Sequence, residues 1–364
     1  MWRPRHIMTA TRVPRLMRAA LARADARVAR VVDGVAAPAI GARDVLVAVR
    51  CAGVNHIDVN ALRDGYAVDV YAGARGRRAA WTPGREFSGV VVAVGDGARG
   101  WRVGDECYGA TAPTTRDGAW AEYARAPAHA VARKPREMTH EEACAIPFAA
   151  LTAHRAVMDR GRARAGERAV VLGGGGAVGT AACALAKSAG CEVVTTCGRR
   201  DAERLMREVG VDEAHDYEEE GFSLARATAS RAPFDLAVDC VGTARTERSA
   251  IDLLKYGVGR YVTLHGDLGK HIASERGMVY GAMKGLGEYA RKATFTRWQR
   301  DVGYEQAVMR LDPDAMIDIA RLVESGKLRV PVGEVLALED IERACDLLRD
   351  PAVFGKIVVR VSEG

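Results

Sequence analysis

Three glycines at fixed spacing are the residues of this chain best suited to binding a ligand. Gly174, Gly176 and Gly179 form a G-x-G-x-x-G pattern between an apolar run at 168–172 and a segment of helical composition at 177–188. In such a setting one glycine makes a tight turn, the second lets backbone N–H groups approach a pyrophosphate, and the third lets the helix pack on the strand. The positive end of the helix dipole then faces the phosphates. The pattern predicts a dinucleotide site, and a glycine hinge without a ligand is the alternative.

The end of the next apolar run indicates which dinucleotide is preferred. Residues 192–196 lead into Cys197-Gly198-Arg199-Arg200, and no carboxylate follows before Asp201. An acid at this position would bind the ribose 2′-OH of NAD. Guanidinium groups instead pair with a 2′-phosphate through charge-assisted hydrogen bonds. We therefore expect NADPH as the cofactor, and two solvated arginines at the start of a helix are the alternative.

The elements that must position these residues alternate between strand and helix. Strands are expected at residues 168–172, 192–196, 236–240, 259–264 and 293–298, and helices at 177–188 and 201–209. This order predicts βαβ units in a parallel sheet with right-handed crossovers. Thr139 and Glu142 have the spacing of a capping box that begins a helix. Before Thr139, short apolar runs and glycine turns predict a small β-rich domain. The tail predicts helices at 313–325 and 341–348 and a final strand at 356–360.

Length and charge exclude several other classes of protein. The chain has 364 residues, which favours two domains. Its net charge is +6, but residues 1–30 hold eight arginines and one acid, so they carry +7 and the remaining residues carry 6 − 7 = −1. A nucleic-acid-binding domain would spread its basic residues over the folded body. We therefore expect no nucleic-acid partner, and no apolar run reaches the roughly 20 residues that span a bilayer.

The first fifteen residues are arginine-bearing and contain no acid, as in many organelle presequences. The alternatives are a disordered tail and an upstream start codon before Met8 or Met17. The eight cysteines are scattered and form no C-x-x-C pair, so we expect free thiols in a reducing compartment.

Several local motifs together resemble the zinc-free quinone-oxidoreductase branch of the medium-chain dehydrogenase/reductase superfamily. The motifs are Val54-Asn55-His56-Ile57-Asp58-Val59-Asn60, Pro83-Gly84-Arg85-Glu86-Phe87-Ser88-Gly89, Val103-Gly104-Asp105-Glu106 and Ala149-Ala150-Leu151-Thr152-Ala153. Arg85, the Asp58-Val59-Asn60 trio and the strand Tyr261–Leu264 most resemble the subfamily of mitochondrial reticulon-interacting oxidoreductases. The resemblance implies an α/β fold with a GroES-like β-rich catalytic domain and a Rossmann doubly wound parallel sheet. The implied boundaries are a targeting segment at 1–15, the catalytic domain at 16–140, the dinucleotide domain at 141–298 and a return at 299–364.

The resemblance also implies where cofactor and substrate bind. Zinc-dependent members carry a cysteine and a histidine where this chain has Asn55 and Arg85, so we expect no metal. Catalytic residues are expected at Tyr66, as proton donor, and at Asn55 and Asp58. The alternatives are that Asp58 caps a helix starting at Val59, that Asn55 holds a turn and that Tyr66 is a wall residue. Cofactor contacts are expected from Gly174, Gly175, Gly176, Ala177, Val178, Gly179, Arg199, Arg200, Tyr217, Gly242, His265 and Lys356.

These expectations combine into a hypothesis about function. We expect an NADPH-dependent, zinc-free oxidoreductase that transfers hydride to a quinone or another conjugated carbonyl, in mitochondria. The alternatives are an enoyl-thioester reductase, and a low-turnover NADPH-binding protein that acts through partners. The resemblance further implies a homodimer joined along an edge strand near 293–298, because an exposed sheet edge is otherwise prone to aggregate.

Overall fold

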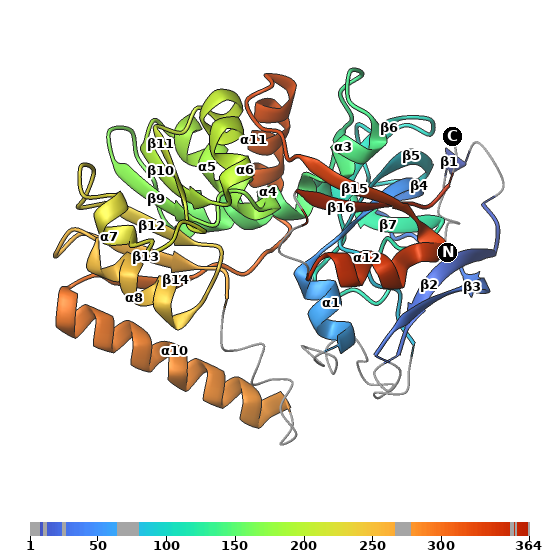
Figure 1. Ribbon diagram of the computed structural model, residues 1–364. Helices are drawn as coiled ribbons and strands as arrows, with labels where there is room; N and C mark the ends of the chain where they lie inside the picture. Colours follow the sequence, from blue (N-terminus) through green and yellow to red (C-terminus); the bar gives the residue numbers. More distant parts are fainter. Residues whose placement is uncertain are drawn as a thin grey trace. The chain divides into compact units, whose positions relative to one another are not determined.

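The chain folds into two compact units in a computed structural model. The structure describes residues 8–9, 13–23, 27–63, 80–265, 278–349, 353 and 355–362. Unit 1 comprises residues 1–148, 311–321 and 331–364, and unit 2 comprises 149–310 and 322–330. Each unit has its own strands (Figure 1). Each also has its own cluster of buried apolar side chains.

Unit 1 is built on a mixed sheet whose strands come from both ends of the chain. Its main path runs β15-β16-β4-β5-β6-β8, with β1 paired to β5 and β7 paired to β4. These strands are β1 (Met8–Thr9), β4 (Asp44–Val54), β5 (Glu86–Val94), β6 (Glu106–Ala110), β7 (Tyr123–Pro127), β8 (Val131–Arg133), β15 (Val332–Ala337) and β16 (Lys356–Arg360). A separate ribbon joins β2 (Leu16–Ala22) to β3 (Ala29–Ala36), and the helices of this unit include α1 (His56–Arg63), α3 (His140–Cys144) and α12 (Ile341–Leu347).

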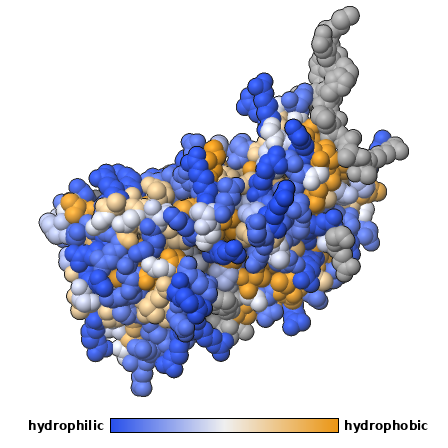
Figure 2. All heavy atoms as spheres, turned by 90° about the horizontal axis from the view of Figure 1, so that it is seen from above, coloured by the Kyte–Doolittle hydropathy of each residue, from blue (hydrophilic) through white to orange (hydrophobic). Residues whose placement is uncertain are grey.

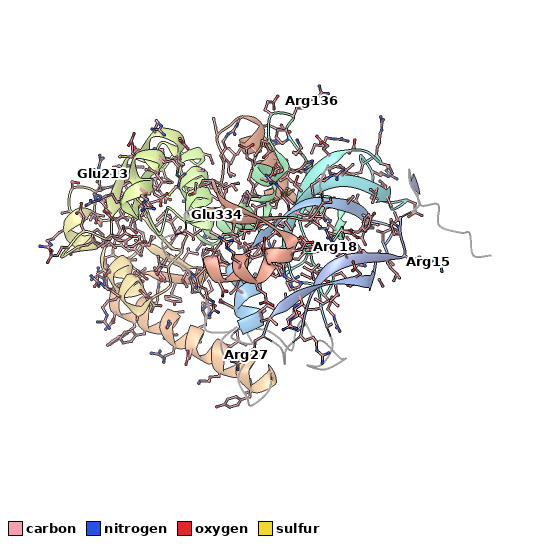
Figure 3. The ribbon with its side chains drawn as sticks, turned by 45° about the vertical axis from the view of Figure 1, so that its right-hand side comes forward. Arg15, Arg18, Arg27, Arg136, Glu213 and Glu334 are labelled. Atoms are coloured by element: carbon pink, nitrogen blue, oxygen red, sulfur yellow. The ribbon has the colours of Figure 1, made fainter. Side chains whose placement is uncertain are left out.

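The arginine-rich beginning of the chain is partly built into this unit. Figure 3 marks Arg15, Arg18 and Arg27, which lie on the β2–β3 ribbon or beside it. Arg18 donates to Glu339 at 2.6 Å and to the carbonyl of Val361 at 3.2 Å. Strand β1 belongs to the expected targeting segment and pairs with β5. Some residues of the basic segment therefore have structural partners in the folded body.

Unit 2 is a six-stranded parallel sheet in the order β11-β10-β9-β12-β13-β14. The strands are β9 (Arg168–Leu172), β10 (Glu192–Cys197), β11 (Glu213–Asp216), β12 (Leu236–Asp239), β13 (Arg260–Thr263) and β14 (Gly303–Gln306). Helices α5 (Ala177–Ser188) and α6 (Arg199–Arg204) lie on one side, and α8 (Ala244–Asp252) and α10 (Met278–Arg300) on the other (Figure 1). Counted along the chain this order is 3-2-1-4-5-6, the doubly wound dinucleotide-binding arrangement. The expected fold class is confirmed.

The other α-helices of the described residues are α4 (Pro147–His154), α7 (Leu224–Ala227) and α11 (Pro313–Glu324). The capping box at Thr139 is confirmed, because its hydroxyl accepts from the Glu142 N–H at 3.2 Å and Glu142 accepts from the Thr139 N–H at 2.9 Å.

The prediction of a strand at 293–298 is wrong. These residues belong to α10, and the last strand is β14, which follows that helix. The hydroxyl of Tyr289 on α10 donates to the carbonyl of Tyr304 on β14 at 3.3 Å. The segment that was expected to join two copies is therefore helical, and the homodimer itself stays a prediction.

No helix among the described residues is both long and apolar enough to cross a bilayer. On the face shown in Figure 2, hydrophilic side chains predominate and hydrophobic ones form small separate groups.

Candidate active site

The glycine-rich turn between β9 and α5 is held by backbone hydrogen bonds to the neighbouring strand. The N–H groups of Gly173 and Gly174 donate to the carbonyl of Thr196 on β10, at 3.1 and 2.8 Å. The hydroxyl of Thr180, one turn into α5, donates back to the carbonyl of Gly174 at 2.9 Å. Helix α5 begins at Ala177, and its N-cap residue Gly176 makes no side-chain cap hydrogen bond. Its first N–H groups therefore remain available to an anion.

The space around each glycine agrees with its expected role. A Cβ on Gly179 would lie 2.0 Å from the carbonyl oxygen of Gly173, and one on Gly174 would lie 2.1 Å from the Thr195 hydroxyl. A Cβ on Gly176 would meet nothing closer than 3.7 Å. Two glycines are thus required by packing, whereas Gly176 leaves open space in front of the helix. Ala177 and Val178 are the first helical residues behind that space. This geometry fits the pyrophosphate of a dinucleotide.

Both arginines after β10 are exposed, and one of them has an acidic partner. Arg199 is 81% exposed, and its Nε lies 3.2 Å from Oδ2 of Asp216 at the end of β11. Arg200 follows on the exposed side of α6. Tyr217, next to Asp216, is 48% exposed, and its N–H donates to the carbonyl of Cys197 at 3.1 Å. Arg199 and Tyr217 thus gather at the carboxyl ends of β10 and β11.

Asp201, which was not predicted to be part of the site, lies against the glycine-rich turn. A Cβ on Gly175 would sit 2.3 Å from Oδ2 of Asp201, so the carboxylate occupies the place of the missing side chain. Asp201 is paired with Arg204 at 3.3 Å. Burial raises the pKa of Asp201, and the neighbouring Arg204 opposes that shift. Spacing along the chain could not show this contact, because it depends on how α6 packs against the turn.

Gly242 and His265 lie beside one another at the carboxyl ends of β12 and β13. Gly242 has a φ of +72°, in the left-handed region. His265 is exposed, and its Nε2 donates to the carbonyl of Cys240 at 3.1 Å. These two residues and the glycine-rich turn follow adjacent strands of one parallel sheet, where such folds bind their ligands.

The other expected site residues form a buried charged cluster in unit 1. The Asn55 amide donates to Oε1 of Glu86 at 2.9 Å and accepts from Nζ of Lys356 at 2.5 Å. Lys356 also pairs directly with Glu86, whose Oε2 accepts from the N–H of Phe148 at 2.8 Å. The side chains of Glu86 and Lys356 are 0% and 3% exposed. Lys356 therefore has carboxylate and amide partners within unit 1, and Glu86 is a residue whose role the sequence did not indicate.

Asp58 and Arg85 form the second charged pair of this cluster. Oδ1 of Asp58 accepts from the N–H of Gly84 at 3.0 Å and lies 3.6 Å from Nε of Arg85. Both side chains are buried, at 0% and 1% exposure. Burial raises the pKa of Asp58, and the Arg85 guanidinium opposes the shift. Helix α1 begins at His56, so the alternative in which Asp58 caps a helix from Val59 is wrong.

Tyr66 lies outside the described residues, and its expected role stays a prediction. Within the part of the chain that the structure describes, no three His, Cys, Asp or Glu side chains are grouped to hold a metal ion.

Comparisons with known proteins agree with this architecture. Residues 41–136 match the family described as alcohol dehydrogenase GroES-like domain, and residues 209–359 match zinc-binding dehydrogenase. The chain is 30% identical over 333 residues to the mitochondrial NAD(P)H oxidoreductase RTN4IP1 of Danio rerio, covering 88% of this chain and 84% of that protein. The chain belongs to the medium-chain dehydrogenase/reductase superfamily.

Two further proteins are similar to this chain, one in sequence and one in fold. It is 27% identical over 327 residues to a quinone oxidoreductase of Lama guanicoe, covering 89% of this chain and 91% of that protein. The solved quinone oxidoreductase of Coxiella burnetii superposes with a TM-score of 0.74 at 24% identity, over 95% of this chain and all of that one. The resemblance stated from the motifs is confirmed at the level of the superfamily and the fold.

Proposed function

We propose that this superfamily member is an NADPH-dependent, metal-independent oxidoreductase that transfers hydride to a quinone or another conjugated carbonyl. The observation that carries the proposal is the uncapped start of α5 behind Gly176, with Arg199 and Arg200 at the end of the next strand. The names of the relatives support it, because they include an NAD(P)H oxidoreductase and a quinone oxidoreductase.

Each residue then has a defined task. The N–H groups at the start of α5 bind the pyrophosphate, and Arg199 and Arg200 pair with the 2′-phosphate. NADPH supplies the hydride when it is bound. Gly242 and His265 form the part of the pocket that faces the nicotinamide ring. Asn55 and Asp58 hold the cluster around Glu86 and Arg85, and Tyr66 is the proposed proton donor to the substrate oxygen.

Cofactor preference tests the proposal directly. The double variant Arg199→Ala, Arg200→Ala should bind NADPH at least about tenfold more weakly, because charge-assisted hydrogen bonds contribute about 1.5–3 kcal/mol. Its affinity for NADH should stay within about twofold. Arg207→Ala is the matched control, since this exposed arginine pairs only with Glu203 and Glu208 in the described structure. Equal dissociation constants of the wild type for NADH and NADPH would refute the cofactor assignment.

Substrate class needs a second experiment. The purified chain should oxidise NADPH with quinones and enals, and prior dialysis against a chelator should leave the rate unchanged. A rate confined to enoyl thioesters, together with a hundredfold loss in Tyr66→Phe, would favour the enoyl-thioester alternative, since such a proton donor contributes about 10²–10⁴-fold.

A further inference from the structure

A buried carboxylate at the end of β12 is fully engaged by the turn that follows it. Asp239 is 0% exposed. Its Oδ1 accepts from the N–H groups of both Val241 and Gly242, each at 2.9 Å. Its Oδ2 accepts from the hydroxyls of Tyr261 at 2.8 Å and Thr246 at 2.9 Å. Four donors from three elements thus fix one side chain, and that side chain fixes the turn.

The turn at residues 240–242 is also held from its other side. A Cβ on Gly242 would lie 2.3 Å from Cγ of His265, so the imidazole ring packs directly on the glycine. Nε2 of His265 donates to the carbonyl of Cys240, which can only accept. A Cβ on Gly173, the first residue of the glycine-rich turn, would lie 2.9 Å from a methyl group of Val241. A shift of the 240–242 turn would therefore also move the glycine-rich turn of the dinucleotide site.

The hydroxyl that supports Asp239 is itself rigidly placed. Tyr261 is buried on β13, and its ring packs against Tyr304 with centroids 5.2 Å apart. The hydroxyl of Tyr304 donates to Glu247 at 3.0 Å, and Lys292 of α10 donates to the same oxygen at 2.9 Å. Burial and the neighbouring carboxylate raise the pKa of Tyr261, which keeps it protonated as a donor.

We propose that Asp239 and Tyr261 are positioning residues that hold the 240–242 turn in the one shape that orients the nicotinamide ring for hydride transfer. The proposal rests on the proposed function, in which this edge of the sheet receives the cofactor. Neither side chain reaches the cofactor, because both are buried beneath the turn. Their effect passes through the N–H groups of Val241 and Gly242.

Tyr261→Phe is the sharpest test, because it removes one of the two donors to Oδ2 and leaves every apolar contact of the ring. Hydrogen exchange at the Val241 and Gly242 amides should become about tenfold faster, as expected when a buried hydrogen bond to a charged group is lost. The kcat for NADPH oxidation should fall about tenfold or more, because small misplacements of reacting groups cost 10- to 100-fold. Binding of 2′,5′-ADP, which lacks the nicotinamide half, should stay within about twofold.

Two controls separate positioning from general support of the fold. Tyr304→Phe removes a hydroxyl from the same aromatic stack but no contact with Asp239, so exchange at the turn and kcat should match the wild type. Thr246→Ser keeps a donor to Oδ2 and should retain kcat, whereas Thr246→Val should behave like Tyr261→Phe.

Three outcomes would overturn the inference. One is an active wild type with unchanged exchange and kcat in Tyr261→Phe. Another is a loss of 2′,5′-ADP binding equal to the loss of kcat, which would indicate general damage to unit 2. The third is a wild type that binds no nicotinamide dinucleotide, and only this result would also overturn the proposed function.

Discussion

Charge balance decides how the interior of unit 1 tolerates four ionisable side chains. Asp58 and Glu86 supply two negative charges, and Arg85 and Lys356 supply two positive ones, all at 3% exposure or less. A buried pair is tolerated when geometry and hydrogen bonds compensate for lost solvation, and losing one partner leaves an unpaired buried charge.

Lys356→Met should lower the free energy of unfolding by about 3–5 kcal/mol, because Glu86 would stay buried without its cation. Urea denaturation measures this loss. Lys327→Met removes an exposed lysine and should change the same quantity by less than about 0.5 kcal/mol. A loss below 1 kcal/mol in Lys356→Met, on the order of an ordinary surface change, would show that the cluster is not electrostatically coupled as described.

His140 gives stability a defined pH dependence. Its Nδ1 lies 2.8 Å from the Ser88 hydroxyl, and its Nε2 lies 3.3 Å from Oε1 of Glu106. Burial, and then the nearby Lys134, lower the pKa of His140. The unfolded chain therefore takes up this proton first as pH falls. The contribution of His140 to the free energy of unfolding is complete above the unfolded-state pKa of about 6.5. It is lost as the pH falls through the lower pKa of the folded state.

Urea denaturation between pH 7.5 and 5 should thus show a falling free energy of unfolding, and His140→Gln should flatten the profile. The exposed His129 serves as the comparison, since His129→Gln should leave the slope unchanged. A profile equally steep in both variants would exclude His140 as its source.

For single helices and strands, the local sequence pattern predicted the element correctly where one of its faces packs on the core. Strand β9 and helix α5 have the bounds expected from the sequence, because apolar runs and glycine punctuation coincide there. A strand was wrongly predicted at 293–298, because Thr294, Phe295 and Trp298 favour strands. Its helical form is stabilised by Tyr289 and Lys292, whose partners Tyr304 and Glu247 come from other elements.

The parts of the candidate site that could be predicted from the sequence are those set by neighbouring residues. The spacing of Gly174, Gly176 and Gly179 fixed a turn and a helix start, which are local properties. The contact of Asp201 with Gly175 depends on packing between elements. Lys356 meets Asn55 across 301 residues of sequence, and no local pattern encodes such a pair.

Two helical glycines should respond oppositely to alanine. Gly179→Ala should destabilise unit 2 by roughly 2 kcal/mol or more and weaken NADPH binding, because its Cβ would overlap the Gly173 carbonyl. Gly287→Ala on α10 should stabilise by about 0.5–1 kcal/mol, because a Cβ there meets nothing within 4 Å. Thermal unfolding followed by circular dichroism compares them, and stabilisation by Gly179→Ala would contradict the packing described.

The first residues of the whole molecule bear on where the protein is located in the cell. We predict import into mitochondria, as the names of the relatives and the acid-free start suggest. Residues 1–25 fused to a fluorescent reporter should direct it to mitochondria, since amphipathic, arginine-rich starts act as presequences. Exchanging Arg3, Arg5, Arg12 and Arg15 for glutamine should abolish that signal, and a diffuse signal from the unchanged fusion would refute the prediction.

The split of unit 1 between the two ends of the chain has a consequence for biosynthesis. Strand β16 lies beside β4 in the mixed sheet, yet it is made after all of unit 2. A nascent chain that has left the ribosome as far as residue 310 can complete the parallel sheet, whereas Glu86 still lacks Lys356. Translation thus obliges the first-made residues to finish folding last, with an open sheet edge in the interval. A premature stop just before Lys356 would spare the dinucleotide-binding sheet and leave the earlier-made unit to chaperones and proteases.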